Sequence, residues 1–351
     1  MEKSYLTPII IPFYRRASVL VFVLIVVSSL TIIAISLAYR TRIEIKLAHA
    51  SSERTKTYYL ALAGLERCRA LLTQQELTAE STARMCWFST TSDKEKLFEG
   101  LKTQPDQRLL LVYGIKDELS YLDLNKSDSA TWENSGCISR QQRASILDWT
   151  DPDSDTNPDG AETDFYEYLE PPYVCKNAPF ICLKELMFVK DITYDNYLGS
   201  ILNEESNREI KSFEDIQYLF NSIITDSSSL VNLFTVYGDG KVNINTVSGE
   251  ILSALPGLEQ ESVNTILLYR SGSDGRSGTD DDVCIENAGV ILQIEGLTEL
   301  QAELLQQYCC FTSDTFRVFS YSKIENYSCF LMATVKITDN KPQILTLERL
   351  L

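Results

Sequence analysis

The sequence predicts an α+β protein that is built on one long N-terminal helix. Residues 17–39 carry no charged side chain and contain an unbroken apolar block, Val19 to Val27. Apolar and polar residues alternate over residues 316–336 and 344–348, which is typical of half-buried strands. Shorter strand patterns at 109–113 and 121–124, around a polar turn, precede a mostly helical middle. Strands before and after therefore bracket a helical region.

Composition limits the classes of partner. The chain has 351 residues, of which 44% are hydrophobic, enough for roughly two to three domains. Its 49 acidic and 32 basic residues give a net charge of −17. Nucleic acid and anionic membrane surfaces would be repelled by such a chain, so cations and basic proteins are the expected partners.

The apolar run 17–39 predicts a membrane-spanning helix. At ~1.5 Å per residue it crosses a bilayer core of roughly 30 Å. No small-residue cleavage site follows it, and it continues without Gly or Pro into a charged helix, so we expect it to be retained. Apolar residues recur at helical spacing to about Thr73, which predicts a stem over 18–73 of roughly 80 Å. Any anchored protein with a juxtamembrane stalk would share this feature.

Two acidic segments predict cation sites. Seven carboxylates lie in residues 148–164 with no Lys or Arg among them, and such crowding favours a bound cation. Oxygen ligands at irregular spacing suit calcium, and the predicted ligands are Asp148, Asp151, Asp153, Asp155, Asp159 and Glu162. A second loop predicts another site with Asp274, Asp280 and Asp282. For both segments the alternative is a solvated acidic loop.

Residues 243–270 predict two helices joined by a turn at Pro256 and Gly257, a helix-hairpin-helix pattern that some proteins use to bind DNA phosphates. That use needs a second glycine two residues after the first, where this chain has Glu259, followed by Glu261. We therefore expect the hairpin to pack or to bind protein. Residues 284–308 predict a second helical pair.

The sequence gives no support for an enzyme. The single histidine, His49, lies on the stem, which excludes Ser-His-Asp and Cys-His sites in the globular part. There is no matched pair of Cys-x-x-Cys motifs for zinc and no P-loop.

Nine cysteines include Cys175 and Cys182, which are close enough in sequence for a local disulfide in an oxidising compartment. Cys309 and Cys310 are adjacent and would pair elsewhere, with Cys284 or Cys329 as candidates. Buried free thiols are the alternative for all of them.

Two stretches resemble known proteins. Residues 16–21, Arg-Ala-Ser-Val-Leu-Val, resemble the type IV prepilin junction, which implies cleavage between Ala17 and Ser18. Residues 147–155, with Gly160-Ala161-Glu162, Pro171-Pro172-Tyr173 and 176–180, are similar to the protein K family of the general (type II) secretion pathway. That family also lacks the Glu that most pilin-class subunits carry at the fifth mature position, which here is Phe22.

The resemblance implies a pilin-like antiparallel sheet on the stem, with a large inserted all-α domain of helix-hairpin-helix or SAM-like type. The implied division is a leader at 1–17, a stem at 18–73, a first part of the core at 74–136, the insert at 137–310 and terminal strands at 311–351. The implied function is a minor pseudopilin at the pseudopilus tip.

The partners that the resemblance implies are the minor pseudopilins I and J and possibly H, a prepilin peptidase and the inner-membrane secretion platform. It implies no binding of nucleic acid. The chain would cross the inner membrane once with its C-terminal domain in the periplasm. A membrane-anchored DNA receptor and an anchored protein with only a structural role are the alternatives.

Overall fold

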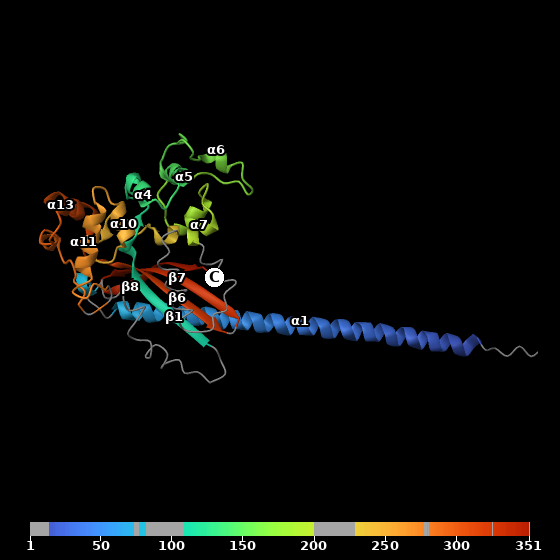
Figure 1. Cartoon of the computed structure of the whole chain (residues 1–351). Coiled ribbons are helices and arrows are strands. Elements are labelled where there is room, and N and C mark those ends of the chain that lie inside the picture. Colours follow the sequence, from blue (N-terminus) through green and yellow to red (C-terminus); the bar gives the residue numbers. More distant parts are fainter. Residues whose placement is uncertain are drawn as a thin grey trace, which may run out of the picture.

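The head of the protein lies on one end of a long helix, α1 (Tyr14–Thr73) (Figure 1). The computed structural model describes residues 14–73, 77–81, 109–199, 229–276, 279, 281–324 and 326–350. The 60 residues of α1 correspond to roughly 90 Å at 1.5 Å per residue. The helix ends at the predicted Thr73 and begins before the predicted Ser18. Within the described chain, α1 is long and apolar enough to cross a membrane, and its apolar window is fully exposed.

The main sheet has four antiparallel strands, β1 (Leu109–Asp117), β6 (Thr315–Ile324), β7 (Tyr327–Thr338) and β8 (Lys341–Arg349). Their order is β1-β6-β7-β8, so a strand from before the helical region pairs with the first strand after it. Successive hairpins join β6, β7 and β8. Together with the stem, this arrangement confirms the predicted α+β class.

The sheet is the middle layer of three. On one face, β7 residues such as Leu331 and Val335 pack against Ala61, Leu65 and other buried stem residues. On the opposite face, alternate β7 residues such as Phe330 and Met332 pack against the helical part. The prediction of half-buried strands is therefore wrong for β6 and β7, which are covered on both faces. The alternation suggested one solvent-exposed face, but several of the polar residues in these strands are buried too. One example is Ser322, whose hydroxyl donates to the Thr57 carbonyl of the stem (2.6 Å).

The two early strands form, but in different sheets. The 3-10 turn η1 (Glu118–Ser120) follows β1 and leads to β2 (Leu122–Asp123). Whereas β1 pairs with β6, β2 pairs in parallel with β3 (Phe234–Thr235). The short turn thus leads the chain from the main sheet into the helical part.

The helical part contains both predicted helix pairs. The Leu255–Glu259 turn joins α10 to α11, and its Gly257 has φ 77° and packs against Leu304. A two-strand parallel sheet, β4 with β5, lies beside them. The remaining bounds are α4 (Ser129–Ser135), α5 (Arg140–Thr150), α6 (Thr163–Tyr166), η2 (Leu183–Phe188), α7 (Tyr194–Leu198), η3 (Leu230–Asn232), β4 (Val242–Asn243), α10 (Gly249–Ala254), α11 (Gln260–Arg270), α12 (Ala288–Ile291), α13 (Glu299–Tyr308) and β5 (Cys309–Cys310).

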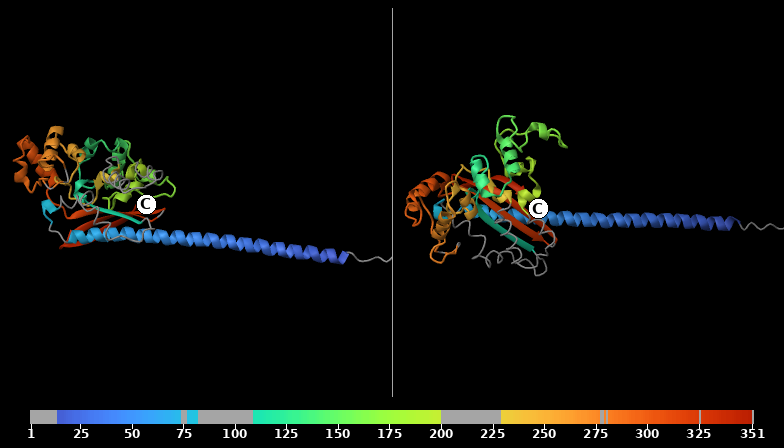
Figure 2. Two further views of the ribbon diagram at one scale, coloured as in Figure 1. Left: turned by 60° about the horizontal axis from the view of Figure 1, so that its bottom comes forward. Right: turned by 45° about the horizontal axis from the view of Figure 1, so that its top comes forward.

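The helical part extends along the stem direction. In Figure 1 and both views of Figure 2, α5, α6 and α7 lie at the end of the head nearest the exposed apolar part of α1, whereas α11 and α13 lie at the opposite end. We call residues 137–199 the stem-side lobe, and the region of α11 to α13 the far end.

A buried ion pair links the sheet to the helical part. Arg317 of β6 is 1% exposed and binds Glu118 of η1 through two hydrogen bonds, Nε to Oε2 (2.8 Å) and Nη2 to Oε1 (2.6 Å). The guanidinium also donates to the Val231 and Phe234 carbonyls, and the Thr235 hydroxyl donates to Glu118 (2.7 Å). No local sequence pattern indicates this network, because its members are far apart along the chain.

The stem contacts the sheet closely at Gly64. A Cβ there would lie 2.2 Å from Ser320 Oγ and 3.1 Å from Leu111 Cδ1. We expect Gly64→Val to lower the free energy of unfolding by about 1–3 kcal/mol, because the added carbons would force the helix away from the sheet. Ala63→Val, on the exposed side of the same turn, should change it little. Denaturant unfolding of both variants in detergent would test this, and equal effects would contradict it.

Candidate metal centre

The site is formed where α5 ends and the following loop returns to it. Ser139 caps the start of α5 in a capping box with Gln142, and the helix ends at Thr150, with Asp151 as its C-cap residue. The final turn carries Asp148, which is fully buried, and the loop returns so that Gly160 and Glu162 lie beside it.

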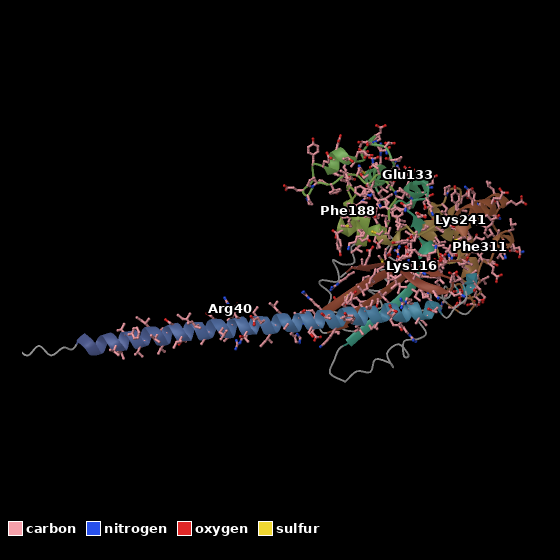
Figure 3. The ribbon with its side chains drawn as sticks, turned by 180° about the vertical axis from the view of Figure 1, so that it is seen from behind. Arg40, Lys116, Glu133, Phe188, Lys241 and Phe311 are labelled. Carbon is pink, nitrogen blue, oxygen red and sulfur yellow. The ribbon has the colours of Figure 1, made fainter. Side chains whose placement is uncertain are left out.

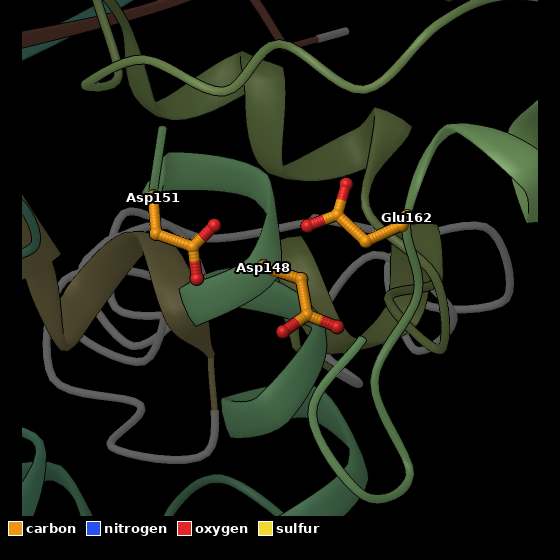
Figure 4. Close-up of side chains that lie close together, drawn as sticks. All are labelled: Asp148, Asp151 and Glu162. Carbon is orange, nitrogen blue, oxygen red and sulfur yellow. The ribbon is translucent and has the colours of Figure 1, made fainter. Parts of the chain in front are cut away.

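Three carboxylates meet there (Figure 4). One oxygen from each of Asp148, Asp151 and Glu162 lies within 4.8 Å of the other two. Glu162 is only 4% exposed, and neither of its carboxylate oxygens accepts a hydrogen bond within normal geometry. Oδ1 of Asp151 is likewise buried without a hydrogen-bond partner.

The loop holds Asp148 in position from two sides. Asn157 donates to Asp148 Oδ1 through its backbone N–H (3.2 Å) and its side-chain amide (2.5 Å). A Cβ on Gly160 would lie 2.0 Å from Asp148 Oδ2, so only glycine leaves room for this carboxylate. Neither Asn157 nor Gly160 was among the predicted ligands.

Burial and mutual repulsion raise the pKa values of two of these groups. For Glu162, burial is the largest cause, followed by the charges of Asp151 and Asp148, while the Cys175 thiol and the Thr163 N–H act weakly in the opposite direction. For Asp151 the causes are burial and then the charges of Asp153 and Asp148. Free of any cation, the site therefore resists ionisation.

This electrostatic cost predicts a pH dependence. The pKa values of Asp151 and Glu162 are higher in the folded chain than in the unfolded chain, where they are about 4. Their contribution to the stability of the folded state is therefore complete below about pH 4, and it is lost as the pH rises through the raised pKa values. In chelator, between pH 4 and 7, we expect the native chain to lose stability relative to Asp151→Asn/Glu162→Gln. Denaturant midpoints of the two proteins at each pH would measure this, and parallel curves would contradict it.

The donor set fits a hard divalent cation. The cluster offers carboxylate oxygens, which calcium and magnesium prefer, and several of them have no other partner. Calcium accepts six to eight oxygens in irregular geometry, so backbone carbonyls and water would complete its shell. Asp148, Asp151 and Glu162 are the residues that would hold it, and it would supply the positive charge that the carboxylates lack.

Three of the six predicted ligands in this segment lie outside the cluster. Asp153 accepts a hydrogen bond from the Asp155 N–H (2.8 Å), and both side chains are solvent-exposed. Asp159 lies 3.4 Å from Arg140, and the Lys190 ammonium donates to the Gly160 carbonyl (2.9 Å). The fold thus brings the basic side chains of Arg140 and Lys190 to an acidic segment that contains no Lys or Arg of its own.

The second acidic loop is organised around a residue that was not predicted as a ligand, Asp281. Its carboxylate accepts hydrogen bonds from the Ser273 N–H (2.7 Å) and hydroxyl (2.7 Å), the Asp274 N–H (3.0 Å) and the Thr279 hydroxyl (2.7 Å). These bonds hold its pKa well below the usual value. The predicted ligand Asp280 lies outside the described residues. Among those that are described, Asp274 and Asp282 belong to no cluster of three acidic groups.

Cys175 and Cys182 are both free thiols in the structure, so the predicted disulfide is not formed there. Cys175 lies under the metal-site cluster, where its Sγ donates to the Asp148 carbonyl (3.5 Å) and burial raises its pKa to about 11. Cys309, Cys310 and Cys329 carry free thiols as well.

The site lies in the segment that is similar to a known family. Residues 137–199 match the family model described as type II secretion system (T2SS), protein K. One similar solved structure is the GspK-GspI-GspJ complex from the type 2 secretion system of enterotoxigenic Escherichia coli, with a TM-score of 0.49 and 14% identity over 85% of this chain and 99% of that chain. No curated protein sequence matched the chain. The three clustered carboxylates therefore lie within the segment that matches the model of the type II secretion system protein K family.

Proposed function

We propose that the protein is a membrane-anchored minor pseudopilin of a type II secretion system that lies at the tip of the pseudopilus. The observation that carries this proposal is the protein K domain at residues 137–199. The long exposed apolar helix and the sheet packed on its other end support it, because pilin-like subunits assemble through such stems. The role is structural rather than enzymatic.

The stem would act as both anchor and assembly element. We propose that a prepilin peptidase cuts between Ala17 and Ser18 and that the head then lies in the periplasm. A carboxylate at the fifth mature position would need a neighbour ahead of it to neutralise its charge in the membrane, and Phe22 imposes no such need. A subunit without this carboxylate can lead the assembly. In lipid, the stems would pack through van der Waals contact at small residues such as Ser28, Ser29 and Ala34.

The metal site would stabilise the stem-side lobe. Bound calcium would neutralise Asp148, Asp151 and Glu162 and tie the end of α5 to the returning loop. The lobe's position and shape would then depend on calcium in the periplasm.

The proposal is tested by expressing the full chain with the GspI and GspJ subunits of its own secretion system, with and without prepilin peptidase. We expect a detergent-stable complex of the three proteins, and an intact mass that has lost residues 1–17 only when the peptidase is present. A chain that keeps residues 1–17 in both strains and purifies alone would overturn the proposal. Salt-sensitive retention of DNA would then favour the DNA-receptor alternative, against which the acidic turn at Glu259 and Glu261 argues.

A further inference from the structure

The stem-side lobe exposes several large apolar side chains within a short stretch of chain. We call Phe165, Tyr168, Tyr173, Val174 and Phe188 the aromatic patch. Tyr168 is 91% exposed, Val174 61% and Phe188 53%. Single exposed apolar residues are ordinary on protein surfaces, but contiguous patches of them mark interaction sites.

Ring contacts link three members of the patch, Phe165, Tyr173 and Phe188, through the buried Tyr166. The ring centroids of Phe165 and Tyr166 are 5.3 Å apart, those of Tyr166 and Tyr173 5.2 Å, and those of Tyr173 and Phe188 5.9 Å. The Tyr173 hydroxyl also donates to the Phe188 carbonyl (2.8 Å).

The patch is firmly supported from below. Tyr166 is fully buried and makes an edge contact with Trp149 of α5, at 5.2 Å between ring centroids. The rings of Phe165, Tyr173 and Phe188 are therefore held by the lobe's own core and require little ordering when a partner binds.

The patch has an acidic rim. Asp164, Glu167 and Glu170 alternate with its members along the chain, and all three are exposed. Two lysines close in sequence are already engaged: Lys190 lies over the Phe165 ring (5.1 Å) and donates to the Gly160 carbonyl, and Lys176 pairs with Glu185 (2.6 Å). Lys184 is exposed, so the segment keeps an excess of acidic side chains. A partner with lysine or arginine around an apolar centre would match this surface, whereas anionic lipid and DNA would be repelled.

The patch also has a definite place in the molecule. Figure 3 shows Phe188 at the edge of the head that faces the exposed apolar part of α1, away from the labelled Lys241 and Phe311. Figures 1 and 2 place the whole lobe at that end. A subunit whose stem packed beside α1 and whose head lay nearer the membrane would meet this edge.

We propose that the aromatic patch docks the head of the neighbouring pseudopilin, through an apolar centre on that head surrounded by lysine or arginine. The inference rests on the proposed function and adds a second contact between the subunits, distinct from packing between their stems.

Site-specific crosslinking tests the docking. A photoreactive phenylalanine would replace Phe188 in the full chain, expressed with GspI and GspJ of the same system. The same residue at Leu47, 63% exposed on the stem, reports stem packing, and at Leu300, 66% exposed at the far end, it serves as a control. We expect crosslinks from position 188 to the head of GspI or GspJ, crosslinks from position 47 to a stem, and none from position 300 to either subunit.

The outcomes separate the two proposals. Crosslinks from 47 without any from 188 would overturn the docking surface and leave the proposed function standing. Crosslinks from 188 only to lipid or to unrelated proteins would overturn it too. Absence of crosslinks from both positions would count against the proposed function itself.

The charge argument has its own test. Glu167→Lys/Glu170→Lys should lower the yield of the 188 crosslink at least several-fold, because like charges would then face each other. Glu295→Lys/Glu303→Lys changes the net charge equally at the far end and should leave the yield unchanged. Equal yields from both double variants would contradict the proposed basic rim on the partner.

Discussion

Replacing Arg317 by Met is expected to lower the free energy of unfolding by about 3–5 kcal/mol, because the change leaves Glu118 as an unpaired buried charge. The guanidinium forms a two-bond fork to Glu118 and also satisfies two carbonyls of the segment around β3. All of these acceptors would lose their donor together. The measurement is denaturant unfolding of the full chain in detergent, followed by tryptophan fluorescence.

A double variant distinguishes the pair from general damage. In Arg317→Met/Glu118→Leu no buried charge remains, so we expect it to regain a large part of the stability that the single variant loses. Lys336→Met breaks an ion pair between half-exposed groups, Lys336 and Asp314 at 3.3 Å, and should cost no more than about 1 kcal/mol. A double variant as unstable as the sum of its single variants would show that the charges are not coupled.

Calcium is expected to stabilise the full chain by about 2.7 kcal/mol at a hundred times its dissociation constant, since binding to the folded state alone shifts the folding equilibrium. Glu162→Gln should abolish most of this effect, because it removes a charged ligand from the cluster. Without calcium, Glu162→Gln should be no less stable than the native chain at pH 7, since the buried carboxylate that it replaces has a raised pKa. Thermal unfolding with chelator and with calcium would measure both effects.

Two further variants make the calcium test specific. Gly160→Ala should weaken the calcium response, because the new Cβ would occupy the place of Asp148 Oδ2. Asp155→Asn removes an exposed carboxylate outside the cluster and should leave the response intact. An equal loss of response in both would indicate diffuse screening of the acidic loop rather than a site.

The stem and the late strands could be predicted from the sequence because their signals are local. The uncharged run and its helical continuation locate α1 to within a few residues, and alternation locates β6, β7 and β8. The strand predicted at residues 121–124 shows what local sequence cannot predict, namely the pairing partner of a strand. A strand was predicted there, but its partner, Phe234 and Thr235, lies more than a hundred residues further along the chain.

The candidate site shows the same limit. Acidic composition pointed to the segment 148–162, yet no spacing rule distinguishes the buried Glu162 from the exposed Asp153 and Asp155. That difference depends on the return of the loop past Gly160. The burial of Arg317 could not be predicted, because an arginine in an apolar strand normally indicates a solvent-exposed position unless a buried acidic partner is known.

The pairing of β1 with β6 has a consequence for the order of folding. About two hundred residues of helical part separate these strands, and the stem residues Ala61, Leu65 and Cys68 are buried against the strands that follow that part. During synthesis the stem emerges first and the strands that cover it emerge last, so its apolar stripe stays exposed until the intervening region and those strands have been made. A chaperone or a neighbouring stem that shielded this stripe in the interval would prevent aggregation. In a nascent chain arrested before β6 the stripe should be exposed, so we expect rapid proteolysis near Leu65.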